Sequence, residues 1–242
     1  MSRLDASLRA PSTNLLLSAL PSREYNRLLS HFDRVPLDFR TVLHEVGQPI
    51  RYLYFPTSGM LSLLLARDGR RTSMEVGVVG REGMVGLSVF LGASSEATRS
   101  IVQVPGEALR IQAEKFHGLV GRDSKLHDLL LRYVHVFLTQ LTHGVACNAL
   151  HSIEKRLCRW LLTVHDRAGC DRFPLTHEFL AAMLGVRRAS VTEAARRLRQ
   201  KGLIRYGRGQ LTVLDRRGLE RNVCGCYRLV RAELDRLMAH IP

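Results

Sequence analysis

The sequence lacks the features that would place the protein in a membrane or outside the cell. It contains no run of 18 or more apolar residues, so no membrane-spanning helix is expected. Its first residues, MSRLDASLRAP, lack the apolar core of a secretory signal peptide. Five cysteines, at irregular spacings, do not form a disulfide framework: Cys147, Cys158, Cys170, Cys224 and Cys226. We therefore expect a cytoplasmic protein with no membrane partner.

Common catalytic motifs are missing as well. There is no glycine-rich nucleotide loop, no nucleophile elbow and no HExxH sequence. His44 is the only histidine in the first expected strands, and it has no His-x-His companion. A cupin-like barrel metalloenzyme is therefore only the alternative from a different functional class, and no catalytic residue is predicted.

Acidic residues are scarce relative to basic ones. The 242 residues carry 36 Lys and Arg against 22 Asp and Glu, a net charge of +14. Residues 151–242 hold 19 of these basic residues against 9 acidic ones, a net +10, so the excess lies mostly in the C-terminal part. This asymmetry predicts a polyanionic partner, because lysine and arginine release counterions from phosphates. The length favours two domains.

Residues 175–215 carry the pattern of a helix, a tight turn, a second helix and a hairpin: LTHEFLAAMLGVRRASVTEAARRLRQKGLIRYGRGQLTVLD. Thr176 is suited to cap the first helix, and Gly185 allows a sharp turn. The second helix is expected to begin near Arg187 or Arg188, and Gly202 to end it. Its buried side is expected to hold Val191, Ala194 or Ala195, and Leu198.

The segment IRYGRGQLTVLD alternates around Gly207-Arg208-Gly209, which indicates a β-hairpin, or wing. A helix with arginine and short polar residues at its N-terminal end can read base edges in the major groove while a wing touches phosphate. Other small helical domains also contain a helix, a glycine and a second helix. The agreement of turn, helix lengths, charge and wing favours a winged helix-turn-helix that binds double-stranded DNA.

The N-terminal part begins with an expected mobile tail (1–12) and two short helices (14–20 and 22–32), the second capped by Ser22. The character then changes to β, with turn signals at roughly ten-residue intervals, which indicates a small antiparallel barrel or jelly roll. The expected strands are TVLHEV, IRYLYF, MLSLLLA, RTSMEVGVV, ATRSIVQV and EALRIQ. The fold class is therefore α+β.

A long helix is expected from about Ser124 to Leu150. Its apolar stripe has little to pack against within one chain, so pairing with a second copy is the expected solution. A core helix lying across its own barrel is the alternative. The residues predicted at a dimer interface are Leu126, Leu130, Tyr133, Val134, Phe137, Leu141 and Val145.

These parts divide the chain into a sensor domain (1–123), a dimerisation helix (124–150) and a DNA-binding domain (151–242), with Ser152 capping the first helix of the last. Their order resembles the Crp/Fnr family of bacterial transcription regulators over nearly the whole chain, most closely over LTHEFLAAMLGVRRASVTEAARRLRQKGLI. The resemblance implies a homodimer that binds a two-fold-related DNA operator, under allosteric control from the barrel and with RNA polymerase as a further partner.

The resemblance also selects the DNA-contacting residues. The family's recognition helix opens with an Arg-Glu-Thr-like run, and the aligned residues here are Arg188, Ala189 and Ser190, followed by Thr192 and Glu193. Because Ala189 and Glu193 depart from the family pattern, a different operator sequence is expected. Glu193 could instead bridge Arg197 at i+4. The expected phosphate contacts are Arg196, Arg197, Lys201, Arg205 and Arg208.

Members of the family that bind cyclic nucleotides use a phosphate cassette, which aligns with residues 80–103 here. Positions Gly83, Gly86, Arg99 and Ser100 match it. Met84 replaces the glutamate that accepts the ribose hydroxyl, and a thioether cannot take that role. Cyclic AMP in the usual pose is therefore not expected, no cofactor is predicted and the effector is unknown. The alternative is a true cyclic-nucleotide-responsive activator.

The cysteines and histidines give little support for a metal or redox site. No cysteine precedes Cys147, which argues against the N-terminal iron–sulfur cysteine cluster of the family's oxygen sensors. His143, Cys147 and His151 are spaced four apart and would share one side of an unbroken helix near the hinge, but packing explains them more simply. Cys224 and Cys226 fall in an expected helix, where residues i and i+2 point apart, so a redox switch formed by this pair is not expected. No metal is therefore predicted.

Overall fold

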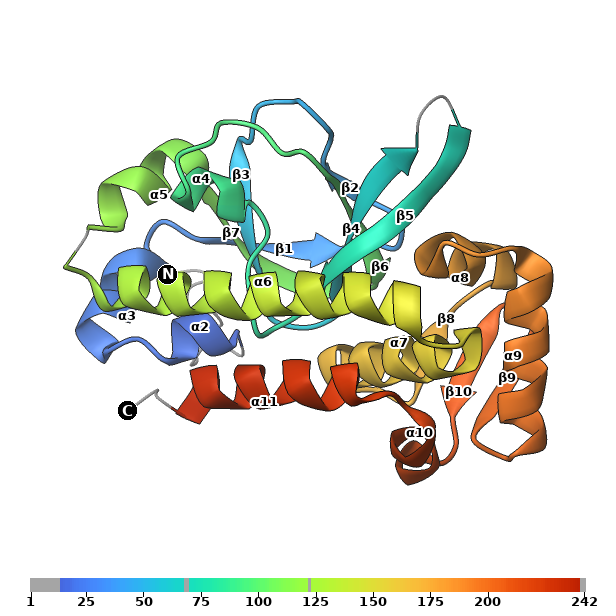
Figure 1. The fold of residues 1–242 in the computed structure, drawn as a ribbon. Coiled ribbons are helices and arrows are strands. Elements are labelled where there is room, and N and C mark those ends of the chain that lie inside the picture. Colours follow the sequence, from blue (N-terminus) through green and yellow to red (C-terminus); the bar gives the residue numbers. More distant parts are fainter. Residues whose placement is uncertain (1–13, 68–69, 122, 240–242) are drawn as a thin grey trace.

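The computed structural model describes residues 14–67, 70–121 and 123–239, so the expected tail (1–12) lies outside the described residues. The sensor part contains two antiparallel sheets (Figure 1). One has the order β1-β7-β3, from Asp33–Leu37, Gly106–Gln112 and Tyr52–Pro56. The other has the order β2-β6-β4-β5, from Val42–His44, Arg99–Val104, Met60–Arg67 and Arg70–Val79.

The sequence therefore predicted the antiparallel sensor fold and its six principal strands, but the sheets do not close into a barrel. Strand β1 was missed, because its segment DRVPL contains a proline and two charged residues that weaken the strand pattern. β1 pairs with β7 in a regular register from Asp33 opposite Arg110 to Leu37 opposite Gly106.

Two short helices, α2 (Leu15–Ser18) and α3 (Ser22–Leu29), precede the sheets. Asn14 anchors this segment, because its side chain caps α2 and its Nδ2 donates to the carbonyl oxygens of Pro56 and Gly83, each at 2.9 Å. The prediction that Ser22 caps the second helix was wrong. Pro21 is at the cap position, where its fixed φ suits the helix start, and makes no side-chain bond.

Helix α6 (Lys125–Leu150) runs along the sheets, after the short helices α4 (Leu87–Phe90) and α5 (Ala113–Leu119) (Figure 1). Ser124 caps it by accepting from the His127 N–H at 3.1 Å. One side of α6 belongs to the hydrophobic core around Phe55 and Phe116. On that side the helix packs on its own sheets, which was the alternative to pairing with a second copy.

Seven residues were predicted for the dimer interface, and the structure revises this set. Leu126, Leu130 and Tyr133 are almost fully buried within their own chain, so they cannot meet a second copy. Val134, Phe137 and Leu141 are half-buried, and Val145 is exposed. The reason is that α6 carries two apolar stripes, and one of them packs against the chain's own sheets.

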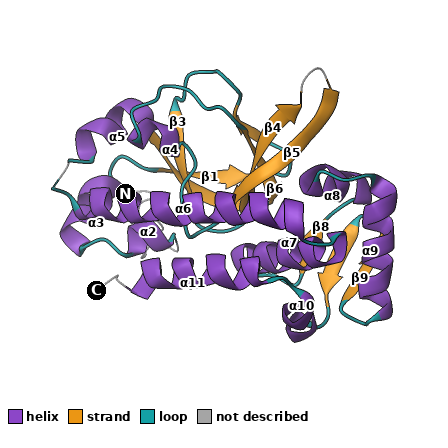
Figure 2. Cartoon of the chain, in the orientation of Figure 1, coloured by secondary structure: helices purple, strands orange, loops and turns teal. Residues whose placement is uncertain are grey.

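The C-terminal part begins with α7 (Ile153–Ala168), capped by Ser152 as predicted, and continues into the helix-turn-helix and wing (Figure 2). Its last helices are α10 (Arg216–Asn222) and α11 (Gly225–Ala239). Helix α11 returns antiparallel along α6, and Leu237 enters the sensor core (Figure 1). The last helix therefore packs against the sensor part as well as the DNA-binding part.

The two parts share a continuous hydrophobic cluster. Met60, Leu64 and Val78 of the second sheet belong to the same cluster as Trp160 of α7 and Leu184 of α8 (His177–Leu184). In this conformation the DNA-binding part is thus docked on the sensor sheet. Among the described residues, no helix is both long and apolar enough to cross a bilayer.

Candidate functional site

The helix-turn-helix consists of α8 (His177–Leu184) and α9 (Arg188–Gln200). Thr176 Oγ1 accepts from the Phe179 N–H at 3.1 Å and so caps α8, as the sequence predicted. Gly185 ends α8 with a φ of 63°, a left-handed conformation that side chains other than glycine rarely adopt. This turn sends α9 along the outer edge of the molecule (Figure 1).

Helix α9 has a buried face and an outer face. The buried face packs on α7 and α8, as predicted, through Val191, Ala194, Ala195 and Leu198. On the outer face, five of the predicted DNA contacts are exposed and two are half-buried. The exposed residues are Arg188, Ala189, Thr192, Arg196 and Arg197, and the half-buried ones are Ser190 and Glu193. The structure therefore brings the candidate recognition residues together on one accessible surface.

In this state Glu193 bridges arginines of its own helix, which was the alternative to a base contact. Its carboxylate accepts from Arg196 Nη2 at 2.8 Å and from Arg197 Nε at 3.1 Å. Hydrogen bonds from these two guanidinium groups lower the pKa of Glu193 to about 2. The carboxylate thus remains ionised, and a contact with cytosine would require it to leave at least one arginine.

His177 is a component of this surface that sequence reasoning missed. Thr192 Oγ1 lies 3.0 Å from His177 Nδ1, and the imidazole ring stacks on Tyr206 of the wing at a centroid distance of 4.3 Å. Burial, followed by the nearby Arg188 charge, lowers the pKa of His177. The stack fixes the wing against α8. No sequence signal links these residues, because the contact depends on how the hairpin folds back.

The wing is formed by β9 (Ile204–Gly207) and β10 (Gln210–Val213), with β8 (Arg172–Pro174) as a third strand that the sequence did not predict. Arg205 and Arg208 are exposed on it. Lys201 Nζ is held by Glu154 Oε1 at 2.5 Å and by Asn222 at 3.1 Å. A phosphate contact by Lys201 would therefore compete with its ion pair on α7.

The five residues aligned with the phosphate cassette lie in different environments. Met84 is buried in the sensor core, and Ser100 is buried in its strand. The exposed Arg99 pairs with Glu45, with 2.8 Å between Nε and Oε1. Gly86 adopts a φ of 93°, which shapes the turn into α4.

Tyr133 of α6 covers the cassette backbone. A Cβ atom added at Gly83 would lie 2.0 Å from the Tyr133 hydroxyl oxygen, so only glycine fits beneath this ring. Burial raises the pKa of Tyr133. A side chain of α6 thus packs directly against the backbone of the segment aligned with the cassette.

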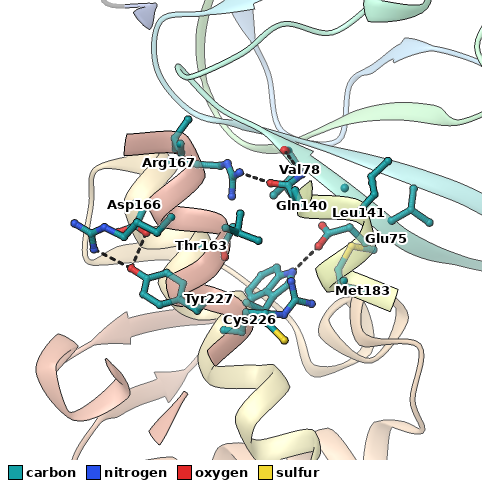
Figure 3. Close-up of a pocket in the computed structure, with 18 of the residues that line it drawn as sticks. Glu75, Val78, Gln140, Leu141, Thr163, Asp166, Arg167, Met183, Cys226 and Tyr227 are labelled. Carbon is teal, nitrogen blue, oxygen red and sulfur yellow. Dashed lines mark hydrogen bonds between the residues drawn. The ribbon is translucent and has the colours of Figure 1, made fainter. Parts of the chain in front are cut away.

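A cavity of about 530 Å³ lies instead at the junction of β5, α6, α7, α8 and α11 (Figure 3). Much of its lining is apolar, including Leu141 and Met183. Glu75 projects into it, and its carboxylate accepts from Trp160 Nε1 at 2.8 Å and from Ser62 Oγ at 2.7 Å. Both sensor and DNA-binding parts therefore contribute to its wall.

A buried polar chain joins the two parts beside this cavity. Arg167 of α7 pairs with Glu82 of the sensor part, with 2.5 Å between Nε and Oε1, and the two side chains are only 10% and 6% exposed. Arg167 also donates to Gln140 of α6, whose Nε2 donates to the Val78 carbonyl oxygen at 3.0 Å (Figure 3). Because breaking a buried pair is costly, this chain holds α7 in one position on the sensor part.

Glu75 gives the junction a pH dependence. Burial raises the pKa of Glu75 from 4.5 to about 7, although the bonds from Ser62 and Trp160 and the charges of Arg159 and Arg167 oppose the shift. The folded state thus binds more protons than the unfolded chain between about pH 4.5 and 7. The free energy of unfolding therefore falls as the pH rises through this window.

We expect Glu75→Gln to raise the free energy of unfolding by about 1–3 kcal/mol at pH 8 and to change it little at pH 5. The glutamine amide is neutral at both pH values, whereas the Glu75 carboxyl is protonated, and therefore neutral, only at the lower one. Denaturant unfolding at the two pH values measures the difference. Glu114→Gln makes the same charge change at an exposed site and should show neither effect. Equal stabilisation at both pH values would contradict a titrating Glu75.

The cysteine and histidine predictions are also revised. Cys147 and His151 converge with Cys224 and Cys226, whereas His143 lies outside this group. The expectation that Cys224 and Cys226 diverge was wrong, because α11 begins only at Gly225 and the two residues do not share a helix. His44, weighed for a metalloenzyme, is buried with Nε2 2.8 Å from the Tyr52 carbonyl oxygen.

Comparison with known proteins assigns both parts. Residues 36–123 match the family model of the cyclic nucleotide-binding domain, and residues 155–222 match that of the Crp-like helix-turn-helix domain. No curated protein sequence matches the chain.

Solved structures share the fold over most of the chain. FixK2 from Bradyrhizobium japonicum is 16% identical, with a TM-score of 0.66 over 80% of this chain and 98% of that one. The c-di-GMP-responsive global regulator CLP from Xanthomonas campestris is 18% identical, with a TM-score of 0.61 over 81% of this chain and 100% of that one. A CRP/FNR-family regulator from Thermus thermophilus is 17% identical, with a TM-score of 0.62 over 78% and 97%.

At these identities the solved structures establish the fold, and the two family models identify its parts. A cyclic nucleotide-binding domain precedes a long helix and a Crp-like helix-turn-helix domain. This combination shows that the chain is a DNA-binding transcription regulator that belongs to the Crp/Fnr family.

Proposed function

We propose that the protein acts as a homodimer that reads a two-fold-related operator through a pair of α9 helices. The observation that carries this proposal is the division of α9, whose apolar face is packed while Arg188, Ala189 and Thr192 remain exposed at its N-terminal end. Side chains at that end of a recognition helix reach base edges in the major groove. Half-sites about 34 Å apart would present successive grooves on one face of the duplex.

A second apolar stripe on α6 supports the dimer. Leu131, Leu138 and Val145 are 50%, 55% and 71% exposed and stand seven residues apart. Between them lie the half-buried Val134 and Leu141, which complete an a/d pattern over two heptads. Apolar positions with this spacing remain accessible even though α11 covers another side of α6. Parallel pairing along this stripe would place two DNA-binding parts at the same end of the dimer.

We further propose that the effector, where one acts, occupies the junction cavity rather than the cassette. The cavity has the size that small-molecule sites show, and its apolar walls are interrupted by charged groups such as Glu75 and Arg167. A ligand there would contact β5 and α7 together and so favour one orientation of the DNA-binding part on the sensor part. This preference would shift the population of dimers that can bind DNA. Met84 and Tyr133 disfavour a cyclic nucleotide in the cassette.

The rival within regulation is a true cyclic-nucleotide-responsive activator. Calorimetry with cyclic AMP, cyclic GMP and cyclic di-GMP separates the two. Binding of cyclic AMP that survives Arg167→Ala but is lost on changing Arg99 would favour the cassette and contradict the junction cavity. A contact with RNA polymerase and a cytoplasmic location complete the proposal and follow from the family.

Selection of bound DNA from a random pool, with and without cell extract, tests the proposal as a whole. The expected result is an enriched sequence with two-fold symmetry, whose enrichment changes when extract supplies the effector. An enriched sequence without symmetry would contradict the dimeric operator. Binding without any sequence preference would contradict recognition by α9.

Phosphate contacts should differ from base contacts in their salt dependence. We expect Arg197→Ala to weaken binding to all DNA sequences alike and to lower the slope of log affinity against log salt by about one per subunit. The reason is that Arg197 is exposed beside Glu193 and bears charge without reaching the N-terminal end of α9. Titrations of two unrelated DNA sequences at several salt concentrations measure it. Arg228→Ala on α11 removes the same charge away from α9, and a similar slope change there would contradict the assignment.

A further inference from the structure

Four metal-ligating side chains meet where α6 ends and α11 begins. Cys147 and His151 lie one helical turn apart at the C-terminal end of α6, and Cys224 and Cys226 flank the first residue of α11. Cys147 Sγ lies 3.5 Å from Cys224 Sγ, and Cys226 Sγ lies 3.8 Å from His151 Nδ1. All four ligand atoms lie within 4.8 Å of one another. Side chains separated by about 75 residues thus converge on one point.

The spacing suits a single tetrahedral ion. With Zn–S bonds of about 2.3 Å and Zn–N bonds of about 2.0–2.1 Å, the edges of a tetrahedron are about 3.8 Å between two sulfurs and about 3.6 Å between sulfur and nitrogen. The observed separations, 3.5 Å between two sulfurs and 3.8 Å between sulfur and nitrogen, lie within a few tenths of an ångström of these edges. A disulfide would need sulfurs about 2.05 Å apart. A cluster of several irons would hold its ligands farther apart, because several metal and sulfide atoms lie between them.

The surroundings suit a metal–thiolate centre. Cys147, Cys224 and Cys226 are buried, and His151 is half-buried. Two arginines of α7 act electrostatically on these thiols: Arg156 on Cys147, and Arg159 on both Cys147 and Cys226. Arg156 is itself more than nine-tenths buried, and its Nε has no hydrogen-bond partner among the described residues.

The charge of a loaded site is compatible with its surroundings. Three thiolates, one neutral imidazole and Zn²⁺ carry a net charge of −1, which the adjacent guanidinium groups of Arg156 and Arg159 can offset. On binding, each thiol releases its proton to solvent, and the sulfur forms a bond to the metal with no change in oxidation state.

We propose that Cys147, His151, Cys224 and Cys226 bind one Zn²⁺ ion as a structural Cys₃His site. Four protein ligands leave no open position for substrate, so the ion has a structural role rather than a catalytic one. It fastens the start of α11 to the end of α6, beside the junction cavity that Cys226 also lines. None of its ligands is among the proposed DNA-contacting residues.

Metal content of the full-length protein gives the first test. We expect about one zinc per chain by elemental analysis after purification under reducing conditions without chelator. Removal of the zinc by a strong chelator should lower the melting temperature, and added zinc should restore it. Cobalt added to the metal-free protein should produce thiolate-to-cobalt charge-transfer absorption and the intense visible bands of tetrahedral Co²⁺. Zinc should then abolish both.

Variants locate the site. Cys224→Ser and His151→Ala should each lower zinc affinity at least 100-fold in competition with a chromophoric chelator. Cys170→Ser, at an exposed cysteine outside the group, and Cys158→Ala, at a buried one nearby, should retain wild-type affinity. Because the wild-type cobalt spectrum needs no variant, a misfolded variant leaves the proposal testable.

Several results would overturn the proposal. One is reduced wild-type protein that neither retains zinc nor gives a tetrahedral cobalt spectrum. Another is iron with labile sulfide in place of zinc. A third is a Cys147–Cys224 disulfide in freshly isolated protein. Equal loss of affinity in Cys170→Ser would also contradict the assigned ligands. A protein that fails to bind DNA specifically yet retains zinc would contradict the proposed operator function and leave this site intact.

Discussion

Leu138→Glu is expected to convert the regulator from a dimer to a monomer and to lower its affinity for a symmetric operator by about 10²–10⁴-fold. The affinity falls because a dimer binds the second half-site as an intramolecular event, whereas two monomers must bind one after the other. Leu138 is 55% exposed and stands in the middle of the outward stripe of α6. Two glutamates facing each other there would bring like charges into an apolar contact.

Sedimentation or light scattering measures the mass, and titration of operator and half-site DNA measures the affinity. Because Leu138 is exposed, the melting temperature of the isolated subunit should change little. Leu91→Glu is the matched control, since Leu91 is 61% exposed and lies at the end of α4, outside the outward stripe of α6. A Leu138→Glu protein that remains dimeric would show that the subunits pair through another surface.

The same stripe shows where sequence reasoning succeeded and where it could not. Periodicity located α6 to within a residue, and its cap at Ser124 lies where the predicted helix begins. Periodicity could not tell which of two apolar stripes meets the sheets, because both are spaced for a helix. Only the tertiary arrangement shows that Leu130 faces inward and Leu138 outward.

The recognition surface was predictable because its determinants are local. Thr176, Gly185 and the apolar spacing of α9 act over a few residues, so the sequence identifies the turn and the buried face together. The wing followed from its glycine-rich turn. The stack of His177 on Tyr206 was not predictable, because it depends on the path of the chain between them.

The contacts that join the two parts also lay beyond sequence reasoning. Glu82 and Arg167 are 85 residues apart, and neither belongs to a motif that requires the other. The convergence of Cys147 with Cys224 depends on the antiparallel return of α11 and on the start of that helix at Gly225. A cysteine spacing along the chain reveals a metal site only when the ligands lie in one local segment.

Arg188→Ala is expected to produce the largest loss of sequence discrimination. Arg188 is exposed and is the first residue of α9, where side chains point toward base edges when the helix enters the major groove. An arginine fork on guanine contributes about 1–3 kcal/mol of discrimination. Because both subunits carry the change, affinity for a two-fold operator should fall by roughly twice that energy, about 30-fold or more.

Anisotropy titrations with the selected operator and with single-base variants measure this effect. The wild type should discriminate among bases at the base pair that Arg188 contacts in each half-site. Arg188→Ala should bind all four bases at that position alike. Arg188→Lys keeps the charge and loses the planar fork, so it separates base recognition from charge. It should recover affinity for unrelated DNA without recovering discrimination. Arg217→Ala, at an exposed position on α10, should change neither. Retained discrimination in Arg188→Ala would instead assign base reading to Ser190, Thr192 and Glu193, and Glu193 would then have to release Arg196 or Arg197 on binding DNA.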